Sequence, residues 1–188
     1  MDTEHERHLI QQAQLGTDPA AIQTLYRQYF PRVFAYVAYR VGRKQDAEDI
    51  VSDIFLRAIE YLGHFEYRGE GSFAAWLFKI AYTQVVNFHR IHSPQQPVPL
   101  EELPDIQSDT LSPDSAILQK ELFARLHHLI TTLAPRRQEV ITLKFFGGLR
   151  NQEIAELLGL DERTIASHLS RGLEDLQRKF EEEKANHE

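Results

Sequence analysis

The sequence predicts an all-α fold of two small helical bundles joined by a flexible acidic linker, the second bundle being a helix-turn-helix domain. Apolar residues recur at helical steps on both sides of the linker, and no stretch alternates as a strand does. The segment 93–115 contains five of the eight prolines and no lysine or arginine. Near the C-terminus, NQEIAELLGLDERTIASHLSRGLEDL places Gly159 between two helical blocks, as a helix-turn-helix requires.

These observations divide the 188 residues into four segments. We expect an N-terminal bundle over 1–91, an acidic proline-rich linker over 92–116, a helix-turn-helix domain over 117–182 and an acidic tail over 183–188. The formal net charge of −7 is concentrated in the linker and the tail, since residues 91–118 hold five acidic residues and no basic one. Both bundles are therefore near neutral, and each should touch DNA locally but bind it weakly alone.

Four helices are expected in the N-terminal bundle, over about 4–15, 19–42, 45–62 and 73–90. Asp18 followed by Pro19 is a typical start of a helix, because the carboxylate caps the first turn and proline fits there. Pro31 should kink or divide the second helix, since it cannot donate a backbone hydrogen bond. In the third helix the apolar residues form a buried side, opposite an acidic, exposed face.

The C-terminal bundle should begin with helices near 116–133 and from Pro135 onward. In the helix-turn-helix, Gly159 can adopt the positive φ that ends one helix, and Asp161 can cap the next. One apolar stripe of that second helix is expected to be buried: Ile165, Leu169, Leu173, Leu176 and Phe180. The opposite face carries arginines, hydroxyls and small residues, which suit a DNA major groove. An ordinary helical hairpin is the alternative for this stretch.

Several classes of protein are disfavoured by composition. The chain has no cysteine, so it has neither disulfides nor thiolate metal sites. The N-terminus MDTEHERH precedes no apolar signal region, and the longest apolar run, 33–39, is too short to span a bilayer. We therefore expect a cytoplasmic protein without membrane insertion. The histidine pairs 5/8, 89/92 and 127/128 lack the spacing of a zinc hydrolase helix, so no metal, cofactor or small-molecule substrate is expected.

Three stretches are diagnostic in combination. They are, in chain order, DAEDIVSDIFLRAIEYL (46–62), FEYRGEGSFAAWLFKIA (65–81) and the helix-turn-helix, with the acidic linker between the second and the third. Over roughly 20–180 the chain resembles bacterial RNA polymerase sigma factors of the sigma-70 superfamily. It is most similar to the extracytoplasmic-function (ECF) group, which keeps only the second and fourth conserved regions. The resemblance places region 2 in 1–91 and region 4 in 117–182.

The resemblance implies a sigma factor, not an enzyme, that binds core RNA polymerase, directs it to a class of promoters and promotes DNA opening. It assigns polymerase binding to Asp46, Asp49, Ser52 and Asp53. It assigns binding of the minus-ten promoter element to eight residues: Phe65, Tyr67, Arg68, Trp76, Lys79, Thr83, Asn87 and Arg90. Of these, Trp76 is also a core candidate by its own pattern, as are Phe73 and Ile80. It assigns binding of the minus-thirty-five element to seven residues: Arg163, Thr164, Ala166, Ser167, His168, Ser170 and Arg171.

At several positions the chain departs from the residue types usual in that family: Ser52, Asp53, Thr83, Val86, Ala166 and His168. Ala166 and His168 remove positive charge from the second helix of the helix-turn-helix, which is the DNA-recognition helix. Binding to the minus-thirty-five element should therefore be weaker or depend more on DNA shape. An anti-sigma factor is a common partner in the family. Two alternative interpretations place the chain in other classes of protein: a stand-alone helix-turn-helix regulator with a helical sensory domain, and a histidine-metal hydrolase. The regulator leaves the pattern of 46–90 unexplained.

Overall fold

The computed structural model describes residues 3–41, 43–92 and 125–185, and every regular element within them is a helix. The elements are α1 (Thr3–Leu15), α2 (Pro19–Ala38), α3 (Lys44–Tyr61), the 3-10 turn η1 (Leu62–His64), α4 (Ser72–Ile91), α6 (Pro135–Phe145), α7 (Asn151–Leu158) and α8 (Glu162–Ala185). Residues 125–131 are also helical. The all-α prediction is confirmed. Of the predicted linker, all but His92 lies outside the described residues, as does 116–124 of the helix expected near 116–133.

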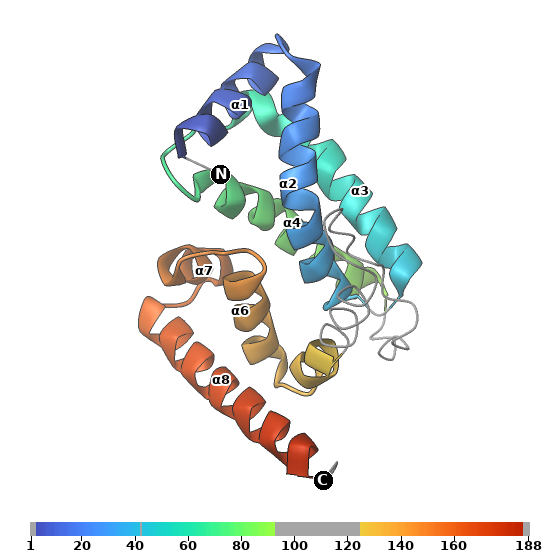
Figure 1. The fold of residues 1–188 in the computed structure, drawn as a ribbon, viewed down its shortest axis with the longest axis vertical. Helices are drawn as coiled ribbons and strands as arrows, with labels where there is room; N and C mark the ends of the chain where they lie inside the picture. Colours follow the sequence, from blue (N-terminus) through green and yellow to red (C-terminus); the bar gives the residue numbers. More distant parts are fainter. Residues whose placement is uncertain (1–2, 42, 93–124, 186–188) are drawn as a thin grey trace.

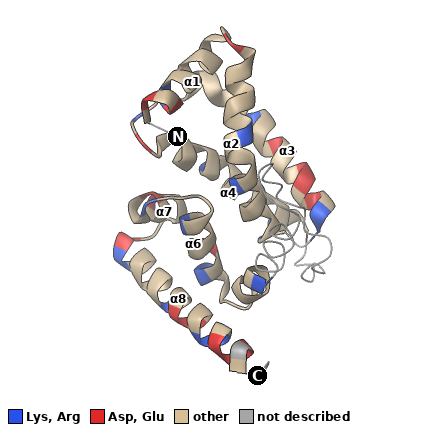
Figure 2. Ribbon diagram, in the orientation of Figure 1, with Lys and Arg blue, Asp and Glu red and all other residues tan. Residues whose placement is uncertain are grey.

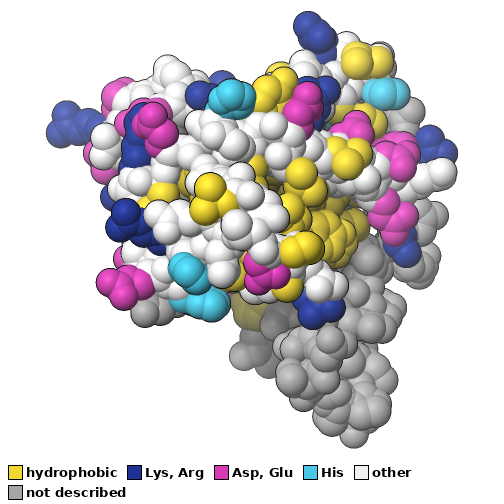
Figure 3. Space-filling view, turned by 90° about the horizontal axis from the view of Figure 1, so that it is seen from above, with side chains coloured by type: hydrophobic (Ala, Val, Ile, Leu, Met, Phe, Trp, Pro, Cys, Tyr) yellow, Lys and Arg dark blue, Asp and Glu magenta, His cyan; other side chains and the backbone are white. Residues whose placement is uncertain are grey.

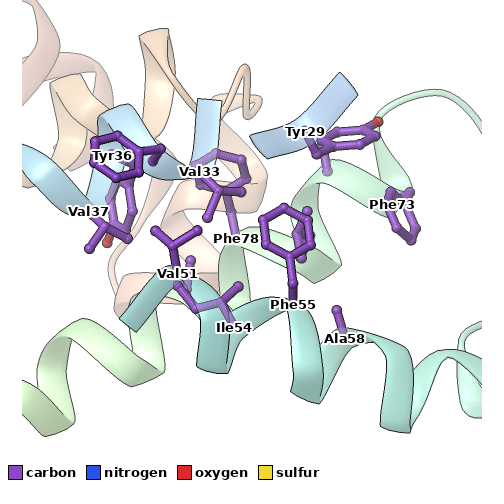
Figure 4. Packing of buried hydrophobic residues seen from close by; sticks show 14 of the residues in the cluster. Tyr29, Val33, Tyr36, Val37, Val51, Ile54, Phe55, Ala58, Phe73 and Phe78 are labelled. Carbon is purple, nitrogen blue, oxygen red and sulfur yellow. The ribbon is translucent and has the colours of Figure 1, made fainter. Parts of the chain in front are cut away.

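Helices α1 to α4 form the N-terminal domain, in which α2 packs against α1, α3 and α4 (Figure 1). Tyr29, Val33 and Val37 of α2 meet Val51, Ile54 and Phe55 of α3 and Phe73 and Phe78 of α4 (Figure 4). The Asp18 side chain accepts a hydrogen bond from the Ala20 backbone N–H, at 2.9 Å. This confirms the predicted start of the second helix.

Pro31 lies inside α2, which continues from Pro19 to Ala38 without a break. The alternative that Pro31 divides this helix is therefore wrong. Proline removes one backbone hydrogen bond. The helix persists because the turns on both sides carry buried residues, Leu25 and Tyr29 before it and Val33 after it.

Residues 125–131 and helices α6, α7 and α8 form the C-terminal domain, where α8 packs against α6 and α7. Gly159 ends α7 with a φ of 64°, a conformation that other residues rarely adopt. The Asp161 carboxylate accepts hydrogen bonds from the backbone N–H and the hydroxyl of Thr164, at 2.8 and 2.7 Å. Both predicted signals of the helix-turn-helix are confirmed. Helix α8 continues to Ala185, and Glu183 pairs with Arg125 at 2.9 Å.

The buried stripe of α8 differs from the prediction. Leu173 and Phe180 are 45% and 43% exposed, so they do not belong to the buried side. Gly172 is buried in their place, between Ile165 and Leu169 on one side and Leu176 on the other. Hydrophobicity alone points to Leu173, because glycine carries no apolar side chain. Gly172 is the buried residue because α8 crosses α6 closely at this point, where a larger side chain has no room.

The two domains are in direct contact, which the sequence pattern did not predict. All seven residues from Val33 to Tyr39 are buried. One side of this segment faces its own domain, while Ala35 and Tyr39 cluster with Ile130, Leu133 and Ile141 of the C-terminal domain. A helical segment that is apolar all round is typically buried on all sides. Within the described ranges, no helix is long and apolar enough to cross a membrane.

Candidate polymerase and nucleic-acid interfaces

Helix α3 separates its buried and exposed residues as the sequence predicted. Ala47, Ile50, Val51, Ile54 and Ala58 are buried. Asp49, Ser52 and Asp53 are exposed and Asp46 is half-buried, so the helix presents carboxylates to solvent. Acidic residues recur along the ribbon of α3 (Figure 2). Their neighbour Glu48 pairs with Lys44 at 3.7 Å across an exposed turn. The outer side of α3 is therefore an acidic surface that a basic partner could contact.

Apolar side chains beside this acidic surface were missed by sequence reasoning. Leu56 is 63% exposed and Ile59 48% exposed on α3, and Tyr26 of α2 is 41% exposed. Tyr26 and Ile59 line an apolar groove between α2 and α3, together with Phe55 and Leu62. Hydrophobic side chains also reach the surface among charged ones in the view from above (Figure 3). Exposed apolar groups beside charges are typical of protein-binding surfaces.

The loop between η1 and α4 is held in a defined conformation. Gly69 and Gly71 have φ values of 109° and 80°, and Gly71 is the N-cap residue of α4. The Ser72 hydroxyl donates to the Gly69 carbonyl at 2.7 Å and accepts from the Arg68 backbone N–H at 3.2 Å. Arg68 is exposed and pairs with Glu66 at 3.1 Å. The loop thus presents Arg68 to solvent on a backbone that is fixed by its own hydrogen bonds.

Phe65 lies differently from what a base-stacking role would require. Its side chain is buried, and its ring packs against Phe73 at 5.4 Å and Trp76 at 5.0 Å between centroids. Only 9% of Phe65 is exposed, so little of its ring is accessible to a base in this structure. Trp76 is half-buried, so part of its ring is still accessible.

Helix α1 tethers this loop, an arrangement that sequence reasoning also missed. The Tyr67 hydroxyl lies 3.1 Å from the Thr3 carbonyl and 3.4 Å from the buried Glu6 carboxylate, which also accepts a hydrogen bond from Tyr29. Burial and the nearby Glu6 carboxylate raise the pKa of Tyr67. The Gln14 amide donates to the carbonyls of Leu62 and Phe65, at 2.9 and 2.6 Å. The signal available in the sequence was Glu6, an acidic residue on the otherwise apolar face of α1.

The minus-ten candidates on α4 share one side of the helix, because their spacing follows the helical repeat. Lys79, Thr83 and Arg90 are exposed, while Trp76 and Asn87 are half-buried. The Thr83 hydroxyl donates to the Lys79 carbonyl at 2.8 Å, so it is engaged within the helix. Together with Arg68 this side offers three cations, an amide and an aromatic ring, groups that bind the backbone and bases of single-stranded DNA.

A cleft of about 580 Å³ separates this surface from the C-terminal domain. Its N-terminal wall includes Arg68, Trp76 and Lys79, and its C-terminal wall includes Glu153 and Glu156 of α7. Of the eight minus-ten candidates, four line the cleft: Phe65, Arg68, Trp76 and Lys79.

The seven minus-thirty-five candidates lie on the first three turns of α8. Arg163, Ala166, Ser167, Ser170 and Arg171 are exposed, and Thr164 and His168 are half-buried. Two of these side chains have local partners, since the Thr164 hydroxyl donates to the Asp161 carboxylate that caps the helix and the Ser170 hydroxyl donates to Glu174 at 2.8 Å. The accessible face is therefore made of two arginines with small residues between them, on the second helix of a helix-turn-helix.

The described histidines do not gather into a metal site, and no group of three or more His, Asp or Glu side chains in those ranges could hold a metal ion. His127 is instead buried at the domain contact, where its ring lies 4.8 Å from that of Tyr39. Burial lowers the pKa of His127. The hydrolase reading has no support from these positions.

Two family models match this chain. The sigma-70 region 2 model matches residues 25–93, and the sigma-70 region 4 model matches residues 123–176. The ECF RNA polymerase sigma factor BldN of Streptomyces coelicolor is 34% identical over 177 residues, which cover 94% of this chain and 66% of that protein. The RNA polymerase sigma-H factor of Pseudomonas aeruginosa is 27% identical over 184 residues, which cover 93% of each.

The solved structure of the sigma factor RpoE from Bartonella quintana, in complex with the anti-sigma factor NepR, has the same fold. It aligns with a TM-score of 0.61 at 21% sequence identity, over 85% of this chain and 96% of that chain. The region 2 model matches the segment that contains the acidic helix and the aromatic loop, and the region 4 model matches the segment that contains the helix-turn-helix. The chain belongs to the sigma-70 family of RNA polymerase sigma factors, in its ECF group.

Proposed function

We propose that this chain is a sigma factor that binds core RNA polymerase, directs it to a particular class of promoters and promotes DNA opening. The observation that carries this proposal is the presence of regions 2 and 4 in one chain, at 25–93 and 123–176. Each region presents an exposed polar face with its own chemistry. A stand-alone regulator would account for α7 and α8 but not for the surfaces of α3 and α4.

Polymerase binding is assigned to the acidic face of α3. Asp49, Ser52 and Asp53 are exposed together on one side of a helix whose other side is buried. Asp46, half-buried, lies at the edge of that face. Carboxylates beside the exposed Leu56 and Ile59 suit a partner that combines basic and apolar groups.

The minus-ten element is assigned to the loop 65–71 and to one side of α4. Arg68, Lys79 and Arg90 can contact phosphates, and the accessible part of Trp76 can stack on an unpaired base. Tyr67 is half-buried and held by α1, so we assign it the role of fixing the loop in addition to any contact with DNA. Phe65 supports Trp76 from the core side.

The minus-thirty-five element is assigned to α8. Arg163 and Arg171 can reach phosphate oxygens or guanine edges, while Ala166 can offer only its methyl group. With few cations on this face, most of the phosphate affinity of the complex must come from the polymerase. The proposed chain performs no chemistry itself, needs no cofactor and acts in the cytoplasm, where an anti-sigma factor could hold it.

Mixing the purified protein with core polymerase tests the proposal directly. The two should co-migrate on size exclusion, and the complex should start transcripts on promoters selected from a random DNA library. Core polymerase alone is the control. A protein that stays separate from the polymerase and binds duplex DNA unaided would instead be a stand-alone regulator.

A further inference from the structure

Helix α1 contacts the loop 65–71 although it precedes the part of the chain that the region 2 model matches. That model begins at residue 25, whereas α1 covers Thr3–Leu15. Helix α1 nevertheless packs against η1, and its polar side chains bond to residues at both ends of that turn. The family match therefore assigns no role to the contacts that this loop makes with α1.

The first of these contacts is made by Gln14, whose side-chain amide joins two backbone carbonyls. Its Nε2 atom donates to the Leu62 carbonyl at 2.9 Å and to the Phe65 carbonyl at 2.6 Å. Both partners are acceptors, so the position requires a group that donates two hydrogen bonds, as an amide nitrogen does. The Phe65 backbone N–H donates to the same Leu62 carbonyl at 3.0 Å. Gln14 therefore fixes the turn from which the loop starts.

The second contact lies about 12 Å away along α1, because Glu6 precedes Gln14 by eight residues. Glu6 is buried, and its carboxylate accepts a hydrogen bond from the Tyr29 hydroxyl. The Tyr67 hydroxyl lies 3.1 Å from the Thr3 carbonyl and 3.4 Å from that carboxylate. Two separate contacts to one helix fix the orientation of the loop as well as its position.

These contacts determine where the side chains of the proposed minus-ten surface lie. Phe65, whose carbonyl is bound by Gln14, packs its ring 5.0 Å from that of Trp76, between centroids. The Arg68 backbone N–H donates to the Ser72 hydroxyl at 3.2 Å. The loop is thus held by α1 at its start and by α4 at its end. A loop that is fixed before DNA arrives loses less conformational freedom when it binds.

Apolar packing already attaches α1 to the rest of its domain, since Leu9, Ile10 and Ala13 are buried. Gln14 is only half-buried, and what it adds is two hydrogen bonds, both to carbonyls at the start of the loop. Loss of its amide should therefore loosen the loop more than it loosens the helix. That difference separates a positioning role from a purely structural one.

We propose that α1 belongs to the minus-ten apparatus, and that Gln14 is a positioning residue that holds the loop 65–71 in the conformation that binds the non-template strand. In this role Gln14 does not touch DNA itself. It acts through the Phe65 carbonyl on the packed rings of Phe65 and Trp76, while Glu6 supports the same loop through Tyr67. The use of this restraint in promoter opening rests on the proposed function of the loop, whereas the restraint itself does not.

Trp76 is the single tryptophan of the chain, so its fluorescence reports on this surface directly. Gln14→Met keeps an unbranched side chain of similar length but removes both donors, and it should make Trp76 more accessible to quenching by acrylamide. Gln14→Lys supplies an ammonium group with three donors and should return the quenching toward the parent value. Gln11→Met makes the same exchange at an exposed position of α1 and should leave the quenching unchanged. Circular dichroism should show that all three variants remain helical.

The second measurement is the affinity of the complex with core polymerase for a single-stranded oligonucleotide that carries the non-template minus-ten strand of a promoter selected with this protein. If the loosened loop adopts the binding conformation about one-fifth of the time, Gln14→Met should raise the apparent Kd about fivefold. Gln14→Lys should recover most of this loss. The salt dependence of binding should be the same in Gln14→Met as in the parent, because no cation is removed. Affinity for core polymerase should also be unchanged.

Lys79→Ala combined with Arg90→Ala checks the minus-ten surface independently of α1, because both cations are exposed on α4. If this double variant loses affinity for the oligonucleotide while Gln14→Met does not, the positioning role is wrong and the minus-ten assignment is supported. If neither loses affinity, the minus-ten assignment is overturned and the positioning role with it. Unchanged quenching of Trp76 in Gln14→Met would overturn the restraint itself.

Discussion

Gly172 of α8 lies so close to Ile141 of α6 that a Cβ at position 172 would be 2.6 Å from the Ile141 Cδ1 atom. Both residues are buried, and α8 packs along α6 at this crossing. The contact orients α8 and so decides which of its residues face solvent. Arg171, adjacent in sequence, is exposed as a direct consequence of this orientation.

Replacing Gly172 by leucine should destabilise the C-terminal domain by about 1–3 kcal/mol, because the side chain has no room against Ile141. Urea unfolding followed by circular dichroism would measure the loss. Glu174→Leu places the same side chain at an exposed position of the same helix and should change the free energy of unfolding by less than about 0.5 kcal/mol. Equal stability of the two variants would contradict the close crossing.

Asp53→Arg should weaken binding to core polymerase at least about tenfold, because it places a positive charge where the proposed partner surface is basic. The side chain is exposed, so the helix content should not change. Fluorescence anisotropy of labelled protein titrated with polymerase would measure the effect. Gln23→Arg, an exposed change of similar size on α2, is the matched control. Undiminished binding would remove this side of α3 from the interface.

Arg68→Ala should reduce open-complex formation while leaving stability nearly unchanged, because the Arg68–Glu66 pair is exposed and such pairs contribute at most about 1 kcal/mol. Permanganate reactivity of unpaired thymines reports opening, and a gel shift reports the closed complex. Tyr67→Phe keeps the ring but removes the hydroxyl that lies near Thr3 and Glu6, so it separates the tether from the DNA contact. An equal loss of both complexes in Arg68→Ala would indicate a role in folding or docking.

Arg171→Ala should weaken minus-thirty-five binding by about 1–3 kcal/mol if the side chain binds a guanine edge, and should relax specificity at one base position. Ala166→Arg should strengthen binding and steepen its dependence on salt by about one unit of log–log slope if the new contact is to phosphate. Anisotropy across a salt series would measure both. Affinity for core polymerase should not change in either variant. If Arg171→Ala binds its promoter with the same affinity as the parent protein, α8 is not the helix that recognises the minus-thirty-five element.

The stability of the folded chain should fall as the pH drops from 7.5 to 5.5, partly through His127. Burial lowers its pKa in the folded protein, so below a pH of about 6.5 the unfolded chain binds more protons than the folded one. One such group contributes at most about 1.4 kcal/mol per pH unit. His127→Gln should reduce this slope, while His89, whose pKa is lowered by burial and by Arg40, retains part of it. Thermal unfolding across this range would measure the difference, and an identical slope in the variant would exclude His127.

Local signals in the sequence determined most of the helices and their ends. Asp18 with Pro19, Gly159 and Asp161 act through atoms within a few residues of themselves, so their effect does not depend on the rest of the fold. The acidic and buried sides of α3 also followed from spacing, because one helix turn fixes which residues share a face. The family followed from the order of three such stretches.

Only the tertiary structure decided which apolar residues find a partner. Leu173 is exposed and Gly172 buried because α6 crosses α8 there, and hydrophobicity does not encode the distance between two helices. Phe65 is buried under Trp76, and Glu6 of α1 reaches Tyr67 across 61 residues of sequence. The run Val33–Tyr39 was visible as apolar, yet its second partner is another domain, joined through Arg32 and Arg40. Contacts between distant segments depend on how whole elements pack, which no periodicity within one segment can specify.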